Sequence, residues 1–341
     1  MTETMQYNQA GHVNRQSDTF HTGRGSAAHH GGIGPAARIA SWRWKPRVAH
    51  IQNAAAADVG RGSETMMTFA RGDLFHAARW LKSGGHKAMV VTGFYIPQAE
   101  QPAAESDGPA GAVELCEALR AIGSDAWLVS DEPCEPVIRA GASSRLPEDH
   151  VAIAPADAQH FDRWVDAMRG LVKRHDIDTI IYIERVGPAR DGNPRNMRGF
   201  DIDRWTAPLS RLTGLGLHVI GIGDGGNEIG MGRLDSIVIE DVVEHGERIA
   251  CTVPADELIV SGTSNWGGHA LVCAMYAMGC RRAAPLLDVA WHRSVLADVA
   301  RAGGLDGVTM RNTPTVDGLS EERYYRQIRM MSDIARGRRH R

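Results

Sequence analysis

The sequence has few cysteines, no excess of basic residues and no long hydrophobic run. Its 341 residues include five cysteines, an odd number, and none of them forms a C-x-x-C pair. We therefore expect neither a disulfide framework nor a cysteine zinc site, and we expect a reducing, cytoplasmic location. The formal net charge of −3 gives no basic surface for nucleic acid. No stretch reaches the roughly 18 apolar residues of a membrane span, so we expect no membrane partner.

The composition otherwise fits a globular chain that can bury a full core, with 43% hydrophobic and 23% charged residues. Residues 1 to about 45 differ, because they are rich in Gly, His, Ser and Ala and poor in large apolar side chains. Such a segment buries too little surface to offset its ordering entropy. We therefore predict a disordered tail over 1–45 and one large domain over 46–341.

From Arg71 onward, continuous apolar stretches alternate with amphipathic ones. Strands are expected at 87–94, 125–131, 179–184, 217–224 and 256–262, and helices at 74–81, 111–123, 157–175, 203–213, 265–279 and 319–335. Asp73 is expected to cap the first helix, Gly123 to end the second, and 141–156 to be a loop. Strands that are apolar throughout are typical of a sheet covered on both faces. We therefore predict an α/β fold with a mostly parallel sheet sandwiched by helices.

Acidic residues gather near the ends of these strands. Because the carboxyl ends of parallel strands meet at one edge of the sheet, we expect these acids to lie close together. Clustered carboxylates repel one another, and a divalent cation relieves that repulsion; ligation by oxygen alone suits Mg²⁺, Mn²⁺ or Ca²⁺ better than zinc. Each acid alone could equally cap a helix or be solvated, but the set favours a metal. The acids are Asp107, Asp131, Glu132, Glu184, Asp224 and Glu228.

The segment GIGDGGNEIGMG (221–232) is the densest local signal. It contains G-x-G-x-x-G after an expected strand, which leaves a dinucleotide site as an alternative. The negative charge of Asp224 and the glycines at 230 and 232 disfavour a pyrophosphate at a helix N-terminus. We expect the loop to approach a cation or a polar substrate closely, through Gly225, Gly226 and Asn227.

The segment GTSNWGGHA (262–270) joins an expected strand to an expected helix. Ser264 is a natural N-cap, and the exposed amides after it suit a substrate carboxylate or phosphate. Asn265 could reach the acidic edge and Trp266 could wall it. A helix cap followed by a core tryptophan is an equally good interpretation of these residues.

The segment 184–202 is long, polar and interrupted by Gly and Pro. Connections of this length are usually either functional or disordered. Its arginines could hold an anionic substrate by bidentate contacts, or they could simply be solvated. They are Arg185, Arg190, Arg195 and Arg198.

Six blocks of the sequence together resemble one family. They are VVTGF (90–94), SDGPAGA (106–112), SDE (130–132), ERVG (184–187), the loop 221–232 and SNWGGHAL (264–271). Over residues 70 to 320, the chain resembles the D-glutamate cyclase family in its C-terminal-domain type, which bacterial proteins carry alone. Where that family typically reads T-D-G-P, Ser106-Asp107-Gly108-Pro109 keeps the hydroxyl.

The resemblance implies a reaction, a cofactor and partners. The reaction is the conversion of D-glutamate into 5-oxo-D-proline and water, by classification a carbon–oxygen lyase reaction. The cofactor is a divalent cation, Mn²⁺ or Mg²⁺, which would withdraw charge from the attacked carboxylate. A mitochondrial member of this family also carries an N-terminal domain that looks like a hydro-lyase. Nothing in this sequence resembles that N-terminal domain. Besides a small-molecule substrate, we expect a homo-oligomer or a separate hydro-lyase partner.

The strand ends and the family blocks together assign site residues. Expected catalytic groups are Asp107, Glu228 and Arg185, with a base near Asp107 or Glu228. Expected metal ligands are Asp131, Glu132, Glu184, Asp224 and Glu228. Expected substrate-binding residues are Thr92, Gly93, Gly108, Gly225, Gly226, Asn227, Ser264, Asn265 and Trp266. Two other functions remain open, a Mn²⁺- or Mg²⁺-dependent phosphatase or related hydrolase, and a non-catalytic domain that binds an amino acid.

Overall fold

A parallel β-sheet forms the centre of the computed structural model, which describes residues 43–83 and 85–338. The predicted tail, 1–45, lies almost wholly outside these residues. The sheet order is β5-β4-β1-β6-β7-β8, and every pairing is parallel. The strands are β1 (Ala88–Val91), β4 (Ala126–Asp131), β5 (Val151–Ala154), β6 (Thr179–Ile183), β7 (His218–Gly223) and β8 (Glu257–Val260). A short antiparallel pair, β2 (Tyr95–Ile96) with β3 (Ala103–Ala104), stands apart from the main sheet.

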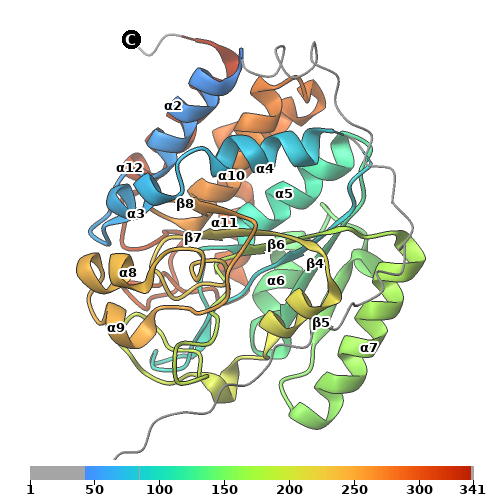
Figure 1. Ribbon diagram of the computed structural model, residues 1–341, viewed down its shortest axis with the longest axis vertical. Helices are drawn as coiled ribbons and strands as arrows, with labels where there is room; N and C mark the ends of the chain where they lie inside the picture. The colour runs from blue at the N-terminus through green and yellow to red at the C-terminus, as the bar shows by residue number, and fades with distance from the viewer. Residues whose placement is uncertain (1–42, 84, 339–341) are drawn as a thin grey trace, which may run out of the picture. The chain divides into compact units, whose positions relative to one another are not determined.

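Helices cover both faces of this sheet, so the predicted α/β sandwich is confirmed (Figure 1). Alternate strand residues face opposite layers: Ala88 and Val90 of β1 join the larger core cluster, whereas Met89 and Val91 join the second. The first layer contains α2 (Lys45–Ala55), α4 (Asp73–Lys82), α5 (Pro109–Ala121), α6 (Glu135–Ala142), α10 (Ser264–Ala277), α11 (Val289–Arg301) and α12 (Glu321–Arg336).

The opposite face is covered by α7 (Ala158–His175) and, near β8, by three shorter helices. These are α3 (Ser63–Phe69), α8 (Ser236–Val242) and α9 (Gly246–Ile249). Among the described residues, no helix combines the length and hydrophobicity needed to cross a bilayer. All five cysteines are free thiols.

Two local expectations about secondary structure were wrong, and a third, the helix cap at Asp73, is described in the next paragraph. The segment 203–213 forms two 3₁₀ turns, Asp203–Trp205 and Leu209–Leu215, because Pro208 and Gly214 interrupt an α-helical pattern. The expected loop 141–156 contains β5, an edge strand that is only half-buried along most of its length. By contrast, Gly123 does end α5, with φ +89° and its N–H donating to the carbonyl of Arg120.

The side chain of Asp73 does not cap α4. Its Oδ2 accepts the backbone N–H of Leu258 at the start of β8 and a hydrogen bond from Arg233 Nε. A buried carboxylate thus fastens the start of α4 to the edge of the sheet.

The strand order reverses at β1, whose neighbours are β4 on one side and β6 on the other. In open parallel sheets, ligands bind beyond the carboxyl ends of the strands at this kind of switch point. The segments that follow β1, β6 and β7 therefore define where a site should be sought.

Candidate active site

Three carboxylates from separate segments come together beyond the carboxyl ends of the strands. Oxygen atoms of Asp107, Glu184 and Asp224 all lie within 4.8 Å of one another. Glu184 directly follows β6, Asp224 directly follows β7, and Asp107 lies just before α5. Their exposed fractions are 1%, 6% and 1%, so the three acids share a site from which water is largely excluded.

Two loops depend on unusual backbone to aim these acids. Glu184 has φ +45°, a left-handed conformation that is uncommon for a side-chain-bearing residue and that turns the chain sharply after β6. Gly108 has φ +93°, and a Cβ there would lie 2.6 Å from Glu184 Cβ and 2.7 Å from Thr92 Oγ1. The loop after β1 can therefore approach Glu184 only because position 108 is a glycine.

The side chain of Asp107 is anchored by the N-terminus of α10. Its Oδ2 accepts the N–H of Ser264 at 2.7 Å and its Oδ1 accepts the N–H of Asn265 at 2.8 Å. Asn265 Oδ1 accepts in return the N–H groups of Gly108 and Gly111 at the start of α5. The N-termini of α5 and α10 are thus held together around one carboxylate.

The helix cap of α10 differs from the predicted one. Thr263, not Ser264, is the N-cap, and its hydroxyl accepts the N–H of Trp266. Trp266 is 1% exposed and stacks on Tyr324 in the core, so it does not wall the site.

Glu228 is close to the cluster but is occupied by its own loop. Its Oε1 accepts the N–H groups of Asp224 and Gly225, and its Oε2 accepts that of Gly226. The carboxylate thus organises the glycine loop after β7, and its expected role as a metal ligand or catalytic base stays a prediction. Asn227 also serves the loop structure, since its Nδ2 donates to the carbonyl of Arg195.

Two predicted site residues form a separate buried pair. Arg185 Nη2 donates to Asp131 Oδ2 at 2.6 Å and to the carbonyl of Ala207, while Nη1 donates to the carbonyl of Gly93. Both charged side chains are at most 1% exposed. This pair fastens β1, β4 and the segment after β6, apart from the three converging carboxylates. The expected roles of Asp131 as a metal ligand and of Arg185 as a catalytic or substrate-binding group stay predictions.

The last predicted metal ligand, Glu132, is exposed and accepts the backbone N–H of Ala156. It is not part of the cluster. Of the arginines in 184–202, Arg190 and Arg195 pair with Glu240 and Asp191 respectively. Among the four arginines of that segment, Arg198 alone lines the cavity described next.

A cavity of about 270 Å³ lies over Glu184 and Asp224. It is also lined by four charged residues for which the sequence reasoning assigned no role. They are Arg61, Glu105, Glu244 and Asp317. Glu105 lies two residues before Asp107 and so is next to an expected site residue, whereas Arg61 and Asp317 lie outside the six sequence blocks.

Arg61 brings a positive charge to the acids. Its Nη1 contacts Asp224 Oδ2 at 2.5 Å, and its fork holds both oxygens of Asp317, with Nη2 2.9 Å from Oδ1. Asp58 shapes the loop that presents Arg61, since its Oδ1 accepts three consecutive N–H groups, those of residues 60 to 62. We call Glu105, Asp107, Glu184, Asp224 and Asp317 the carboxylate cluster.

Burial dominates the electrostatics of this cluster. Burial, reinforced by the neighbouring Asp317 and opposed by the N–H groups of α10, raises the pKa of Asp107 to about 7. Burial, reinforced by repulsion between neighbouring carboxylates, also raises the pKa values of Glu105, Glu184 and Asp224 well above their usual range. One guanidinium cannot neutralise five acids, so the cluster favours binding of further positive charge.

The donor set suits a hard divalent cation. Glu105 Oε1 and Glu184 Oε2 are buried without a hydrogen-bond partner, which is costly unless something else binds them. The ligands in reach are all carboxylate oxygens, as Mn²⁺ and Mg²⁺ prefer. Asp107, Glu184 and Asp224 are the residues that could hold such an ion.

Comparison with known proteins agrees with the sequence blocks. A family model described as "D-glutamate cyclase-like, C-terminal" matches residues 51–332. The chain belongs to this family. The match extends beyond the 70–320 expected from the blocks, so α2, α3 and α12 are part of the family domain.

One curated member of the D-glutamate cyclase-like family is human "D-glutamate cyclase, mitochondrial". It is 31% identical over 210 residues, which cover 58% of this chain and 33% of that protein. The chain therefore spans about a third of the length of this relative. A solved structure described as a DHH domain of the s1p family of ribosomal proteins covers 89% of this chain and 68% of its own, at 13% identity and a TM-score of 0.33.

Proposed function

We propose that the chain is a divalent-cation-dependent carbon–oxygen lyase that closes D-glutamate to 5-oxo-D-proline and water. The observation that carries this proposal is the convergence of Asp107, Glu184 and Asp224 under a cavity in a chain of this family. The named activity of the human relative supports the choice of reaction.

Ring closure requires one bond to form and one to break. The α-nitrogen of the substrate bonds to its side-chain carboxyl carbon, a C–O bond of that carboxyl breaks, and the oxygen leaves as water with two protons from the ammonium group. A bound Mn²⁺ or Mg²⁺ would make the carboxyl carbon electrophilic by drawing charge from its oxygens. The residues of the chain must therefore hold the substrate folded, move two protons and exclude water.

Asp107 is the best-placed group for the proton transfers. It lies within 4.8 Å of both other acids, and a pKa of about 7 suits a group that takes a proton and gives it back near neutral pH. Its two hydrogen bonds to α10 fix its orientation. Arg198 and Arg61 line the cavity and supply the cations for the α-carboxylate of the substrate.

The direct test is an assay of the purified chain on D- and L-glutamate with Mn²⁺ or Mg²⁺, with 5-oxoproline separated by chiral chromatography. We expect product from D-glutamate only with a cation present. Asp224→Asn removes one carboxylate from the cation site without changing side-chain volume, and we expect kcat/KM to fall by about 10²–10⁴-fold.

Glu132→Gln is the matched control, because Glu132 is an exposed acid at the same edge of the sheet but outside the cluster. We expect this variant to keep wild-type activity. Absence of ring closure with either enantiomer and either ion would reject the proposal, as would cation-dependent release of phosphate from small esters without any lactam product. Equal losses in both variants would reject the carboxylate cluster as the active site.

A further inference from the structure

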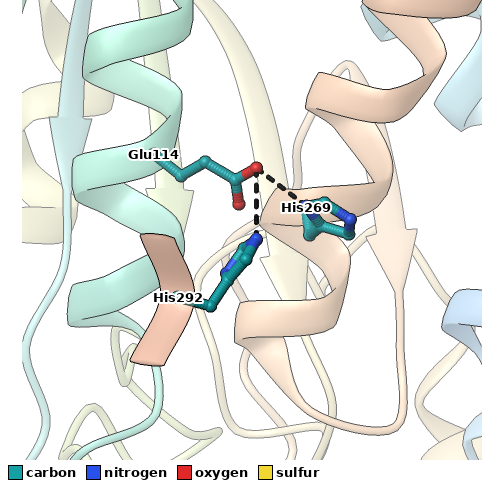
Figure 2. Close-up of side chains that lie close together, drawn as sticks. All are labelled: Glu114, His269 and His292. Atoms are coloured by element: carbon teal, nitrogen blue, oxygen red, sulfur yellow. Dashed lines mark hydrogen bonds and ion pairs between the residues drawn. The ribbon is translucent and has the colours of Figure 1, made fainter. Parts of the chain in front are cut away.

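A second group of potential metal ligands lies inside the helical layer. Glu114 of α5, His269 of α10 and His292 of α11 point toward one another from three helices (Figure 2). One donor atom from each lies within 4.8 Å of the other two, and all three side chains are at most 1% exposed. Glu114 Oε1 is 2.8 Å from His269 Nδ1 and 3.8 Å from His292 Nε2. We call these residues the histidine cluster.

Close helix packing creates this arrangement. A Cβ on Gly268 would lie 3.0 Å from the Cα of Gly111, so the backbones of α5 and α10 nearly touch there. One turn along α5 from Gly111 is Glu114, and the residue after Gly268 is His269. The two side chains are therefore brought together by a contact that only glycines permit.

The hydrogen bonds of the outer ring nitrogens of His269 and His292 determine the tautomer of each ring. In each ring they leave the inner nitrogen as an acceptor. His269 Nε2 faces the carbonyl of Ile328 at 3.3 Å and the hydroxyl of Ser332 at 3.0 Å, and His292 is hydrogen-bonded to the backbone of Leu286. A carbonyl can only accept, so in each ring the outer nitrogen carries the hydrogen and the inner one presents a lone pair. Histidines that bind metals are oriented in this way by the partner of their other nitrogen.

Within residues 43–83 and 85–338, these inward lone pairs are not all matched by hydrogen-bond donors. Glu114 Oε2 and His292 Nε2 are buried and have no hydrogen-bond partner. A carboxylate and two neutral imidazoles facing one point require a cation or a proton between them.

We propose that Glu114, His269 and His292 form a structural zinc site that ties α5, α10 and α11 together behind the sheet. Two imidazole nitrogens and one carboxylate oxygen supply three donor atoms of the kinds that bind zinc. Mixed nitrogen and oxygen ligands favour zinc over Mg²⁺ or Mn²⁺. Cys273 Sγ is 3.3 Å from the outer nitrogen of His269, on the far side of the ring, and so is not a ligand. The proposal does not rest on the lyase activity.

The competing explanation is a proton on Glu114, since burial raises the pKa of this carboxyl to about 8. A protonated Glu114 would donate to His269 and need no metal. The two explanations differ in what a glutamine would do at position 114, because glutamine imitates a protonated acid in shape and hydrogen bonding but binds zinc poorly.

The first measurement is the metal content of the full chain, purified without a histidine tag or chelator. We expect one tightly held zinc per chain. Unfolding in denaturant with EDTA and refolding without metal should lower Tm by about 5–15 °C, and refolding with Zn²⁺ should restore it. Refolding with Co²⁺ should give the strong visible absorption of a four-coordinate site with nitrogen ligands, which an all-oxygen site does not give.

Glu114→Gln should lose the zinc and melt at the temperature of the metal-free wild type, whereas Asp224→Asn, in the other cluster, should keep both zinc and Tm. Wild-type chain that is isolated without zinc and whose Tm does not respond to refolding with Zn²⁺ would overturn the proposal. A Glu114→Gln variant as stable as zinc-loaded wild type would overturn it too. Failure of the variant to fold leaves the wild-type zinc content and refolding to decide.

Discussion

The carboxylate cluster and the histidine cluster are built on the same two helices but in opposite environments. Asp107 and Asn265 stand at the N-termini of α5 and α10, and Glu114 and His269 follow one to two turns later on these helices. The first cluster adjoins a cavity, offers only oxygen ligands and contains Arg61 as a cation of its own. The second is sealed in the core and combines nitrogen with oxygen.

The difference shows how position in the fold selects chemistry. At the carboxyl edge of a parallel sheet, loops can leave acids accessible to a ligand that enters and leaves. Between packed helices, a polar group persists only if every partner is satisfied from within. We therefore expect exchange of ions and substrate at the carboxylate cluster and permanent occupation at the histidine cluster.

Chelation of the folded protein should distinguish the two clusters most strongly, and we expect its effect on activity to be the largest of those predicted. Dialysis against EDTA should strip the carboxylate cluster, which adjoins a cavity, and lower lyase activity by about 10²–10⁴-fold, with recovery on adding Mn²⁺. The sealed histidine cluster should keep its zinc, so Tm should barely move. Activity, zinc content and Tm measured on the same sample check this. Loss of zinc before loss of activity would reverse the assignment of the two environments.

The fold was predictable from the sequence because its main strands are apolar on both faces. That pattern predicted five of the six strands of the main sheet, and it failed for β5, an edge strand whose residues are half-exposed. It also predicted a helix where Pro208 and Gly214 allow only 3₁₀ turns. A strand buried on both faces has a recognisable hydrophobic pattern in the sequence. An edge strand such as β5 lacks this pattern, and its formation depends on pairing with a neighbouring strand.

The candidate site was predictable only in its strand-end acids. Glu184 and Asp224 follow strands directly, so topology alone places them at one edge. Arg61 and Asp317 arrive from opposite ends of the chain, and their approach depends on tertiary packing. The sequence did not indicate the local contacts of Glu228, because they depend on a glycine loop that lets a carboxylate four residues after Asp224 fold back onto the N–H groups of that loop.

The histidine cluster gave no sequence signal. Its members are separated along the chain and sit in helices whose buried faces are mostly apolar. Short spacings such as H-x-x-x-H reveal a metal site when one helix carries two ligands, but here each helix carries one. Only the packing of α5, α10 and α11 reveals the group.

The next largest effect is a loss of stability on substitution of Asp131. This buried acid lies at the carboxyl edge of the sheet and is paired with Arg185. Asp131→Ala leaves Arg185 buried without its partner, and we expect a loss of about 3–5 kcal/mol in the free energy of unfolding. Denaturant unfolding measures it. Because Asp131 lies outside the carboxylate cluster, Mn²⁺ affinity and activity per folded molecule should stay at wild-type values. A selective loss of Mn²⁺ binding would place this acid in the cation site after all.

A smaller effect is expected at Gly108, where the loop of Asp107 meets Glu184. Gly108→Ala puts a Cβ 2.6 Å from Glu184 Cβ in a left-handed conformation, so we expect a cost of about 2–3 kcal/mol together with weaker Mn²⁺ binding. Gly123→Ala is the matched control, with φ +89° and no atom within 4 Å of the new Cβ. It should cost only about 1 kcal/mol and leave Mn²⁺ binding unchanged. Equal Mn²⁺ affinities in both variants would show that the close contact does not position Glu184.

The smallest expected changes in the free energy of unfolding concern the N-terminus of α10, a helix that carries residues of both clusters. They test which acceptors hold this N-terminus. Three of its N–H groups donate to side-chain acceptors: Asp107 binds those of Ser264 and Asn265, and the Thr263 hydroxyl binds that of Trp266. Thr263→Ala removes one acceptor of the three and should cost about 1 kcal/mol. Ser264→Ala removes a buried hydroxyl that has no partner and should leave the free energy of unfolding nearly unchanged. If Ser264→Ala were the more costly change, its hydroxyl would be a working part of the site, and the cap would have to be reassigned. If neither change mattered, Asp107 alone would hold the helix start, and its carboxylate would then couple the cation site to the packing of α10.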